Sequence, residues 1–254
     1  YLKRFPIGKL KVDQSFVRGI ATDDATFEAA KGFVAKLGKK TAVAEDFPAF
    51  IVNRILLPMI SGIRELEEAL HLIHRAWCEV RDEGLDVIMP PVGVMIEVPA
   101  AVYLTRELAR MVDFISVGSN DLTQYLLAVD RNNARVASIY DAFHPAVIRA
   151  LQLLVDASRR YHKPVSVCGE LAGDPVGVLL LLAMGYRRFS MNTHNISRIK
   201  YVLRQSDLGE LKALMADGLK HDNPHVLRGL FARYLEEHGL GGLLRAGHKV
   251  RLPD

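Results

Sequence analysis

Cysteine is scarce in this sequence, which has two among 254 residues, Cys78 and Cys168. Neither stands at the spacing of a metal-binding motif, which argues against a zinc or iron–sulfur centre held by thiolates. A chain with so few thiols is typical of a reducing compartment, so we expect a cytoplasmic protein.

Long apolar runs and basic tracts are absent as well. The stretch "VGVLLLLAMG" at 176–185 is too short to span a bilayer, and we find no signal-peptide pattern, so we expect no membrane association. The net charge is +4, yet no basic run is interleaved with aromatic residues, so we expect no nucleic-acid partner. A mild positive charge suits an anionic metabolite instead.

Half of the residues are hydrophobic, which is enough for one large core. Short β-branched runs alternate with amphipathic helical stretches, and this alternation predicts a parallel sheet covered by helices. The candidate strands lie at 9–13, 40–45, 54–59, 92–98, 114–119, 164–170 and 187–192.

Seven strands leave two architectures open, an open sheet or a TIM-type (βα) barrel, which needs eight strands. We favour the barrel, as one domain over 1–254 that is either incomplete or closed by dimerisation. An unclosed barrel exposes strand edges that pair readily with a second copy, so we expect a homodimer.

Helix boundaries are marked by capping residues. Ser61 is a candidate N-cap for an amphipathic helix that Gly84 follows, and Asp174-Pro175 opens another that Gly185 closes. A third helix is expected from Asn223-Pro224 to Gly239, and a fourth spans Phe27 to Leu37.

Polar residues follow several of the predicted strands. Glu97, Asp121 and Cys168 all stand at carboxyl ends, where functional groups of parallel α/β folds gather. Two converging carboxylates suit Mg²⁺. Asn120 offers amide donors and Arg131 a bidentate phosphate contact.

Each of these residues also has a structural interpretation. In that interpretation, Asp121 caps the next helix, Arg131 is a solvated surface charge, and Cys168 is a small buried hydrophobe. The combination on consecutive strand ends favours the functional interpretation, in which Cys168 is a general acid.

From about Leu57 to His248, the chain resembles the C-terminal barrel of phosphoenolpyruvate–protein phosphotransferase, the enzyme I of sugar phosphotransferase systems, especially its nitrogen-related form. The resemblance rests on "LLPMISGIRELEEA", "GVMIEVPAA", "DFISVGSNDLTQYLLAVDRNN", "HPAVIRAL", "VCGELAGDP" and "RFSMN", in the family's order. It covers about three quarters of the chain.

The resemblance implies a role for each matching position. Glu97 and Asp121 would hold magnesium, Asn120 and Arg131 would contact phosphoenolpyruvate or pyruvate, and Cys168 would protonate the enolate. The family has a further phosphate-binding arginine just before "ILLPMI", where this chain has Arg54.

Residues 1–60 resemble other families, so we divide the chain into a patchwork part, 1–60, and a phosphotransferase-like part, 61–254. Residues 1–20 look like a piece of an EAL phosphodiesterase barrel, with Lys11 and Asp13 but without its other signatures. Residues 24–60 resemble part of a 3-hydroxyacyl-CoA dehydrogenase, without a dinucleotide-binding fingerprint. The sequence thus looks like a chimera.

Two alternatives remain open. The dehydrogenase resemblance makes 47–60 helical, whereas the phosphotransferase resemblance makes 54–59 a strand. The phosphohistidine domain of the family has no counterpart here, so we expect a Mg²⁺-dependent phosphoenolpyruvate-binding barrel impaired in full phosphoryl transfer. The alternative is a non-catalytic chimeric or engineered barrel, or an oligomerisation module.

Overall fold

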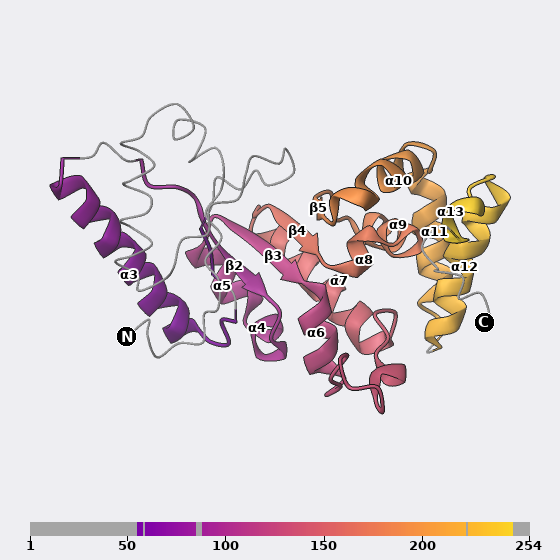
Figure 1. Ribbon diagram of the computed structural model, residues 1–254, viewed down its shortest axis with the longest axis horizontal. Coiled ribbons are helices and arrows are strands. Elements are labelled where there is room, and N and C mark those ends of the chain that lie inside the picture. Colours follow the sequence, from indigo (N-terminus) through magenta and orange to yellow (C-terminus); the bar gives the residue numbers. More distant parts are fainter. Residues whose placement is uncertain (1–54, 58, 85–87, 222, 246–254) are drawn as a thin grey trace, which may run out of the picture. The chain divides into compact units, whose positions relative to one another are not determined.

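The computed structural model describes residues 55–57, 59–84, 88–221 and 223–245 (Figure 1). The chain divides into two compact units. The first runs to Ser116 and also contains Arg160–Pro164, and the second comprises Val117–Arg159 and the chain from Val165 onward. The strands predicted at 9–13 and 40–45 and the helix predicted from Phe27 lie outside the described residues.

The first unit contains two parallel strands and the start of a third. Strand β1 (Ile55–Leu57) pairs with β2 (Val92–Ile96), with Ile55 opposite Val92 and Leu57 opposite Val94. The third strand, β3 (Phe114–Gly118), passes from the first unit into the second. The strand predicted at 54–59 is thus confirmed at 55–57, and the helical alternative for this stretch is wrong.

Helix α3 (Ile63–Asp82) buries one face of the predicted amphipathic pattern. The prediction of Ser61 as its N-cap is wrong, because Gly62 holds that position. Ser61 instead donates from its backbone nitrogen (2.7 Å) and hydroxyl (2.8 Å) to the Glu65 carboxylate, and Gly62 N donates to the same carboxylate at 3.3 Å, which is the backbone half of a capping box. These bonds, the one from the Ser61 backbone foremost, lower the pKa of Glu65. Two short helices follow β2, α4 (Pro99–Tyr103) and α5 (Thr105–Met111).

In the second unit, β4 (Val165–Cys168) and β5 (Phe189–Ser190) pair in parallel, with Val167 opposite Phe189. Helix α6 (Ser119–Leu126) follows β3, and a 3₁₀ turn, η1 (Ala137–Ile139), precedes α7 (Pro145–Arg160). The remaining helices are α8 (Glu170–Gly173), α9 (Pro175–Met184), α10 (Thr193–Arg204), α11 (Leu208–Gly218), α12 (Pro224–Glu237) and α13 (Gly242–Arg245).

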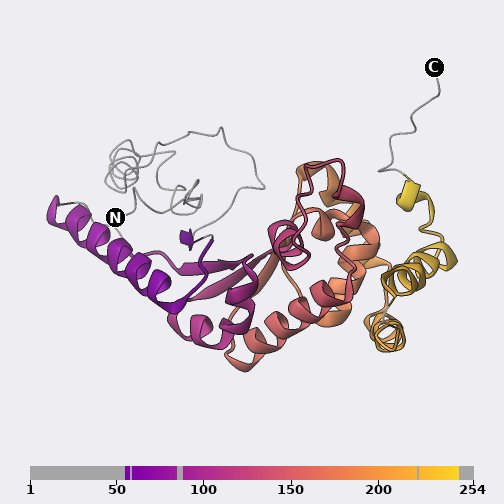
Figure 2. The same cartoon turned by 90° about the horizontal axis from the view of Figure 1, so that it is seen from below.

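Helix α9 is the core of the second unit. All of its residues except Leu182 are buried, and it contacts α8, α10, α11, α12 and α13 (Figures 1 and 2). Burying each leucine contributes about 1.5–3 kcal/mol. The predicted boundaries are confirmed: the Asp174 side chain accepts a hydrogen bond from Gly177 N (2.9 Å), and Gly185 closes the helix at φ +109°. The helix predicted from Asn223 is likewise confirmed as α12.

The strand–helix alternation confirms an α/β fold with parallel strand pairs. Five of the seven predicted strands lie in the described part of the chain, and each is shorter than its sequence pattern suggested. No helix of the described residues combines the length and the apolar character needed to cross a bilayer.

Candidate functional site

Glu97 directly follows β2 in the first unit, as predicted. Its side chain is buried, and its Oε1 accepts a hydrogen bond from Met59 N at 2.9 Å. Met59 lies just after β1 in the left-handed region, at φ +59°, a conformation that costs a non-glycine residue free energy. The backbone after β1 is therefore shaped to place an N–H group on this carboxylate.

Asp121 lies in the first turn of α6, directly after β3, in the second unit. Gly118 is the N-cap of that helix, so the interpretation of Asp121 as a cap is wrong. Its Oδ1 atom lies 3.3 Å from Nη2 of Arg131, and both side chains are about a third exposed, at 39% and 34%. Arg131 is thus paired with Asp121, and the interpretation of Arg131 as a merely solvated charge is wrong.

Both the side chain and the backbone of Asn120 accept hydrogen bonds. Its Oδ1 accepts a hydrogen bond from Glu170 N (3.1 Å), and its carbonyl accepts one from the Tyr140 hydroxyl (3.3 Å). Because the amide oxygen is occupied, the amide nitrogen is the group that remains to donate to a ligand.

Cys168 ends β4, and its thiol donates to the carbonyl of Val117 at 3.3 Å. The Ser119 hydroxyl donates to the carbonyl of Cys168 at 2.6 Å. The cysteine is half-buried, which differs from the interpretation of Cys168 as a small buried hydrophobe.

Arg131 lies on the loop after α6. Its backbone nitrogen donates to Gln124 Oε1 at 3.3 Å, and its Nη1 is buried with no hydrogen-bond partner among the described residues. An unpaired buried guanidinium nitrogen is costly, and an anionic oxygen of a ligand would satisfy it. The arrangement is therefore suited to an anion.

Tyr140 is a site residue that the sequence pattern did not reveal. Its pKa is raised, mainly by burial, and the nearby Glu170 carboxylate adds to this, while hydrogen bonding with Thr123 and Arg131 opposes it. Tyr140 lies in an irregular loop, where no periodicity marks it. Ser119 and Glu170 stand within the quoted motifs beside the predicted residues.

The second unit thus brings together Asn120, Asp121, Arg131 and Cys168, whereas Glu97 belongs to the first unit. Arg54 lies outside the described residues. Within the described ranges, no group of three or more His, Cys, Asp or Glu side chains is arranged to hold a metal ion.

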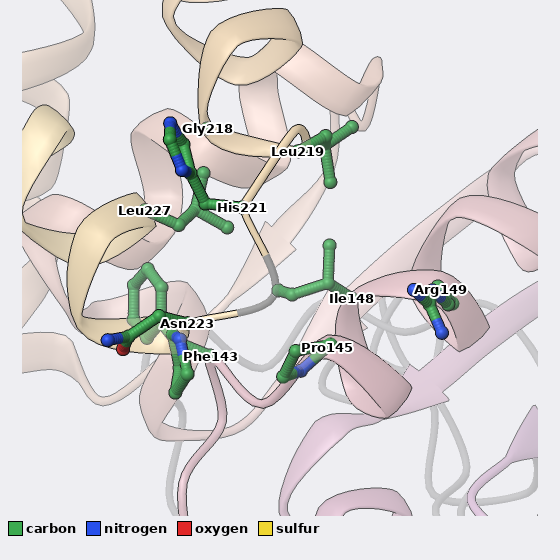
Figure 3. Close-up of a pocket in the computed structure, with 10 residues that line it drawn as sticks. Phe143, Pro145, Ile148, Arg149, Gly218, Leu219, His221, Asn223 and Leu227 are labelled. Carbon is green, nitrogen blue, oxygen red and sulfur yellow. The ribbon is translucent and has the colours of Figure 1, made fainter.

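A pocket of about 30 Å³ lies elsewhere in the second unit, between the start of α7 and the connection from α11 to α12 (Figure 3). Its lining includes Phe143, Ile148 and Leu227, and it contains none of the predicted site residues. That volume holds no more than about two water molecules, too few for a three-carbon acid phosphate.

Residues 40–208 match the model of the PEP-binding domain of PEP-utilising enzymes. The chain belongs to this family, whose domain is a TIM-type barrel, and the predicted fold class is confirmed. Its similarity to enzyme I of the phosphotransferase system is confirmed as well. The match begins inside the range 24–60, and the suggested chimera stays a prediction.

Among the relatives is the phosphoenolpyruvate-dependent phosphotransferase system protein of Escherichia coli K12, 46% identical over 194 residues, which are 76% of this chain and 26% of that protein. Another is the phosphoenolpyruvate-protein phosphotransferase of Haemophilus influenzae, 38% identical over 193 residues, 76% of this chain and 34% of that protein. The chain thus spans about a quarter to a third of the length of these relatives.

Among solved structures, a citrate lyase from Burkholderia xenovorans LB400 is 21% identical, with a TM-score of 0.46, covering 77% of this chain and 66% of that one. A citrate synthase variant is 16% identical, with a TM-score of 0.39, and the match covers 76% of each chain.

Proposed function

We propose that this chain binds phosphoenolpyruvate or pyruvate together with Mg²⁺, as the substrate barrel of a phosphotransferase. The observation that carries the proposal is the grouping of Asn120, Asp121, Arg131 and Cys168 in one unit, within the range that matches the PEP-binding domain. Similarity to two phosphotransferases at 38–46% identity supports it.

Each side chain has a chemical role in the proposal. The Arg131 guanidinium, with its unpaired Nη1, and the Asn120 amide nitrogen bind the phosphate group. After phosphoryl transfer, the Cys168 thiol gives its proton to C3 of the enolate, which becomes pyruvate, and the sulfur is left as a thiolate.

Magnesium is proposed from the donor chemistry of the individual side chains. Asp121 would supply carboxylate oxygens and, by resemblance, so would Glu97 of the other unit, and Mg²⁺ is commonly held by one or two carboxylates while it keeps several waters. When bound, the ion supplies positive charge that stabilises the enolate oxygen. Arg54 is proposed as a further phosphate ligand by resemblance alone.

The phosphoryl acceptor is proposed to be a histidine on another domain, as in the family. These 254 residues by themselves are then expected to bind the substrate and exchange its C3 protons, but to be impaired in complete phosphoryl transfer. The protein is proposed to act in the cytoplasm as a homodimer.

Proton exchange tests the proposal without any phosphoryl acceptor. Pyruvate in D₂O with Mg²⁺ should lose its methyl proton signal in ¹H NMR when the protein is added, because Cys168 can remove and return the C3 proton. Cys168→Ala should abolish this exchange and keep the binding of Mg²⁺-oxalate, an enolate mimic, in calorimetry. Cys78→Ala, at a half-buried position on α3, is the matched control and should change neither.

Glu97→Ala should remove the heat of Mg²⁺-oxalate binding. A wild-type protein that gives no such heat, or exchange that survives in Cys168→Ala, would contradict the proposed function.

A further inference from the structure

The loop that carries Arg131 is anchored to α6 at two places. Near its start, Val129 N donates to the Gln124 carbonyl (2.9 Å) and Arg131 N to the Gln124 side chain (3.3 Å). At its far end, after η1, the Tyr140 hydroxyl donates to the Asn120 carbonyl (3.3 Å). The segment between these anchors is mostly exposed, so the anchors rather than core packing fix its path.

Tyr140 is suited to be the far anchor. Its side chain is half-buried, so the ring excludes water from part of its surroundings. Burial raises the pKa of its hydroxyl, which therefore keeps its proton and remains a donor at neutral pH. Because Tyr140 also ends the loop that carries Arg131, its bond to the Asn120 carbonyl links both residues that the proposed function assigns to the phosphate group.

We propose that Tyr140 is a positioning residue that holds Arg131 and the backbone of Asn120 in the geometry needed to bind the phosphate of phosphoenolpyruvate. This inference rests on the proposed function, because it concerns the phosphate side of that same site.

The direct contact of Tyr140 lies on the phosphate side of the proposed site. Its hydroxyl donates to the Asn120 carbonyl at 3.3 Å, whereas the Asp121 carboxylate is held by Arg131 Nη2 at 3.3 Å. A ligand without a phosphate group, bound through the metal side, does not need Arg131 in place. Loss of the hydroxyl should therefore weaken the binding of ligands that contain a phosphate group and leave the binding of phosphate-free ligands nearly unchanged.

The test compares two ligands on two variants of the full chain by calorimetry in Mg²⁺. Tyr140→Phe should bind phosphoenolpyruvate about fivefold more weakly, which is the loss expected for one hydrogen bond, and oxalate within about twofold of wild type. Tyr125→Phe, on the exposed face of α6, should match wild type for both ligands. Tyr140→His keeps a ring N–H donor and should recover part of the lost affinity.

Three results would overturn the inference. Unchanged phosphoenolpyruvate affinity in Tyr140→Phe would show that the hydroxyl does not position Arg131. Equal losses for both ligands would show a general structural role. A wild-type protein that binds neither ligand would reject the proposed function itself, which is distinguishable from the first two. Should Tyr140→Phe fail to fold, Tyr140→His is compared with wild type on the same two ligands.

Discussion

Gly169 joins Cys168 to Glu170 in a backbone conformation, φ +109° and ψ −176°, that is essentially restricted to glycine. A Cβ atom there would lie 2.6 Å from both the Asn120 Oδ1 and the Ser119 hydroxyl. This one residue therefore lets β4 approach the start of α6 closely enough for the hydrogen bond from Glu170 N to Asn120.

Gly169→Ala should lower the free energy of unfolding by about 2 kcal/mol, because backbone strain and steric overlap add. It should also displace Asn120 and weaken phosphoenolpyruvate binding. Denaturant unfolding followed by calorimetry measures both effects. The control is Gly229→Ala, in open space on α12, which should stabilise the protein by about 0.5–1 kcal/mol. Equal stability of wild type and Gly169→Ala would contradict the argument.

At the scale of elements, Tyr186 ties α7 to the end of α9. It is fully buried, and its hydroxyl donates to the Leu151 carbonyl at 2.7 Å. Burial, with a smaller contribution from Asp156, raises the pKa of Tyr186 far above its usual value, while Arg159 opposes the shift. The phenol thus stays neutral in the folded protein at a pH where it ionises in the unfolded chain.

This difference makes stability fall in alkali. Above about pH 10 the unfolded chain releases a proton that the folded protein retains, so the free energy of unfolding decreases by about 1.4 kcal/mol per pH unit from this residue. Tyr186→Phe should lower the free energy of unfolding by about 1 kcal/mol at neutral pH. Above about pH 10, the free energy of unfolding of this variant should fall less steeply than that of wild type. Urea unfolding across pH measures both slopes, with Tyr201→Phe, half-exposed on α10, as control. Parallel slopes in wild type and Tyr186→Phe would refute the prediction.

The elements were predictable where the sequence pattern is strong. Asp174, Pro175 and Gly185 mark both ends of α9 by their own backbone preferences, and the structure confirms both ends. The start of α3 was missed by one residue, because serine and glycine are both acceptable N-caps. Which one is used depends on how Glu65 reaches back to the Ser61 backbone, and a pattern of residue types does not contain that geometry.

For the whole molecule, ligand binding should stabilise the folded protein by mass action. At about a hundred times the dissociation constant, phosphoenolpyruvate with Mg²⁺ should add about 2.7 kcal/mol, or about 5–10 °C in Tm for a chain of this size. Excess chelator should remove the shift, and Glu97→Ala should not show it. A shift that persists in chelator would mean that the ligand binds without the metal.

The sequence indicated which residues form the candidate site, but not the contacts between them. The strand ends and motifs indicated Glu97, Asn120, Asp121, Arg131 and Cys168. The ion pair of Asp121 with Arg131 and the anchoring by Tyr140 depend on how the loop after α6 folds back. That path is set by tertiary hydrogen bonds rather than by local propensity, so the sequence alone did not reveal it.

The division of the chain also constrains its synthesis. Residues 160–164 belong to the first unit, where Ile115 N donates to the Pro164 carbonyl at 2.9 Å, although Val117–Arg159 belong to the second. A ribosome must therefore make the chain through Pro164 before the first unit has all of its parts, so co-translational folding cannot complete the first unit before Val117–Arg159 of the second has been synthesised.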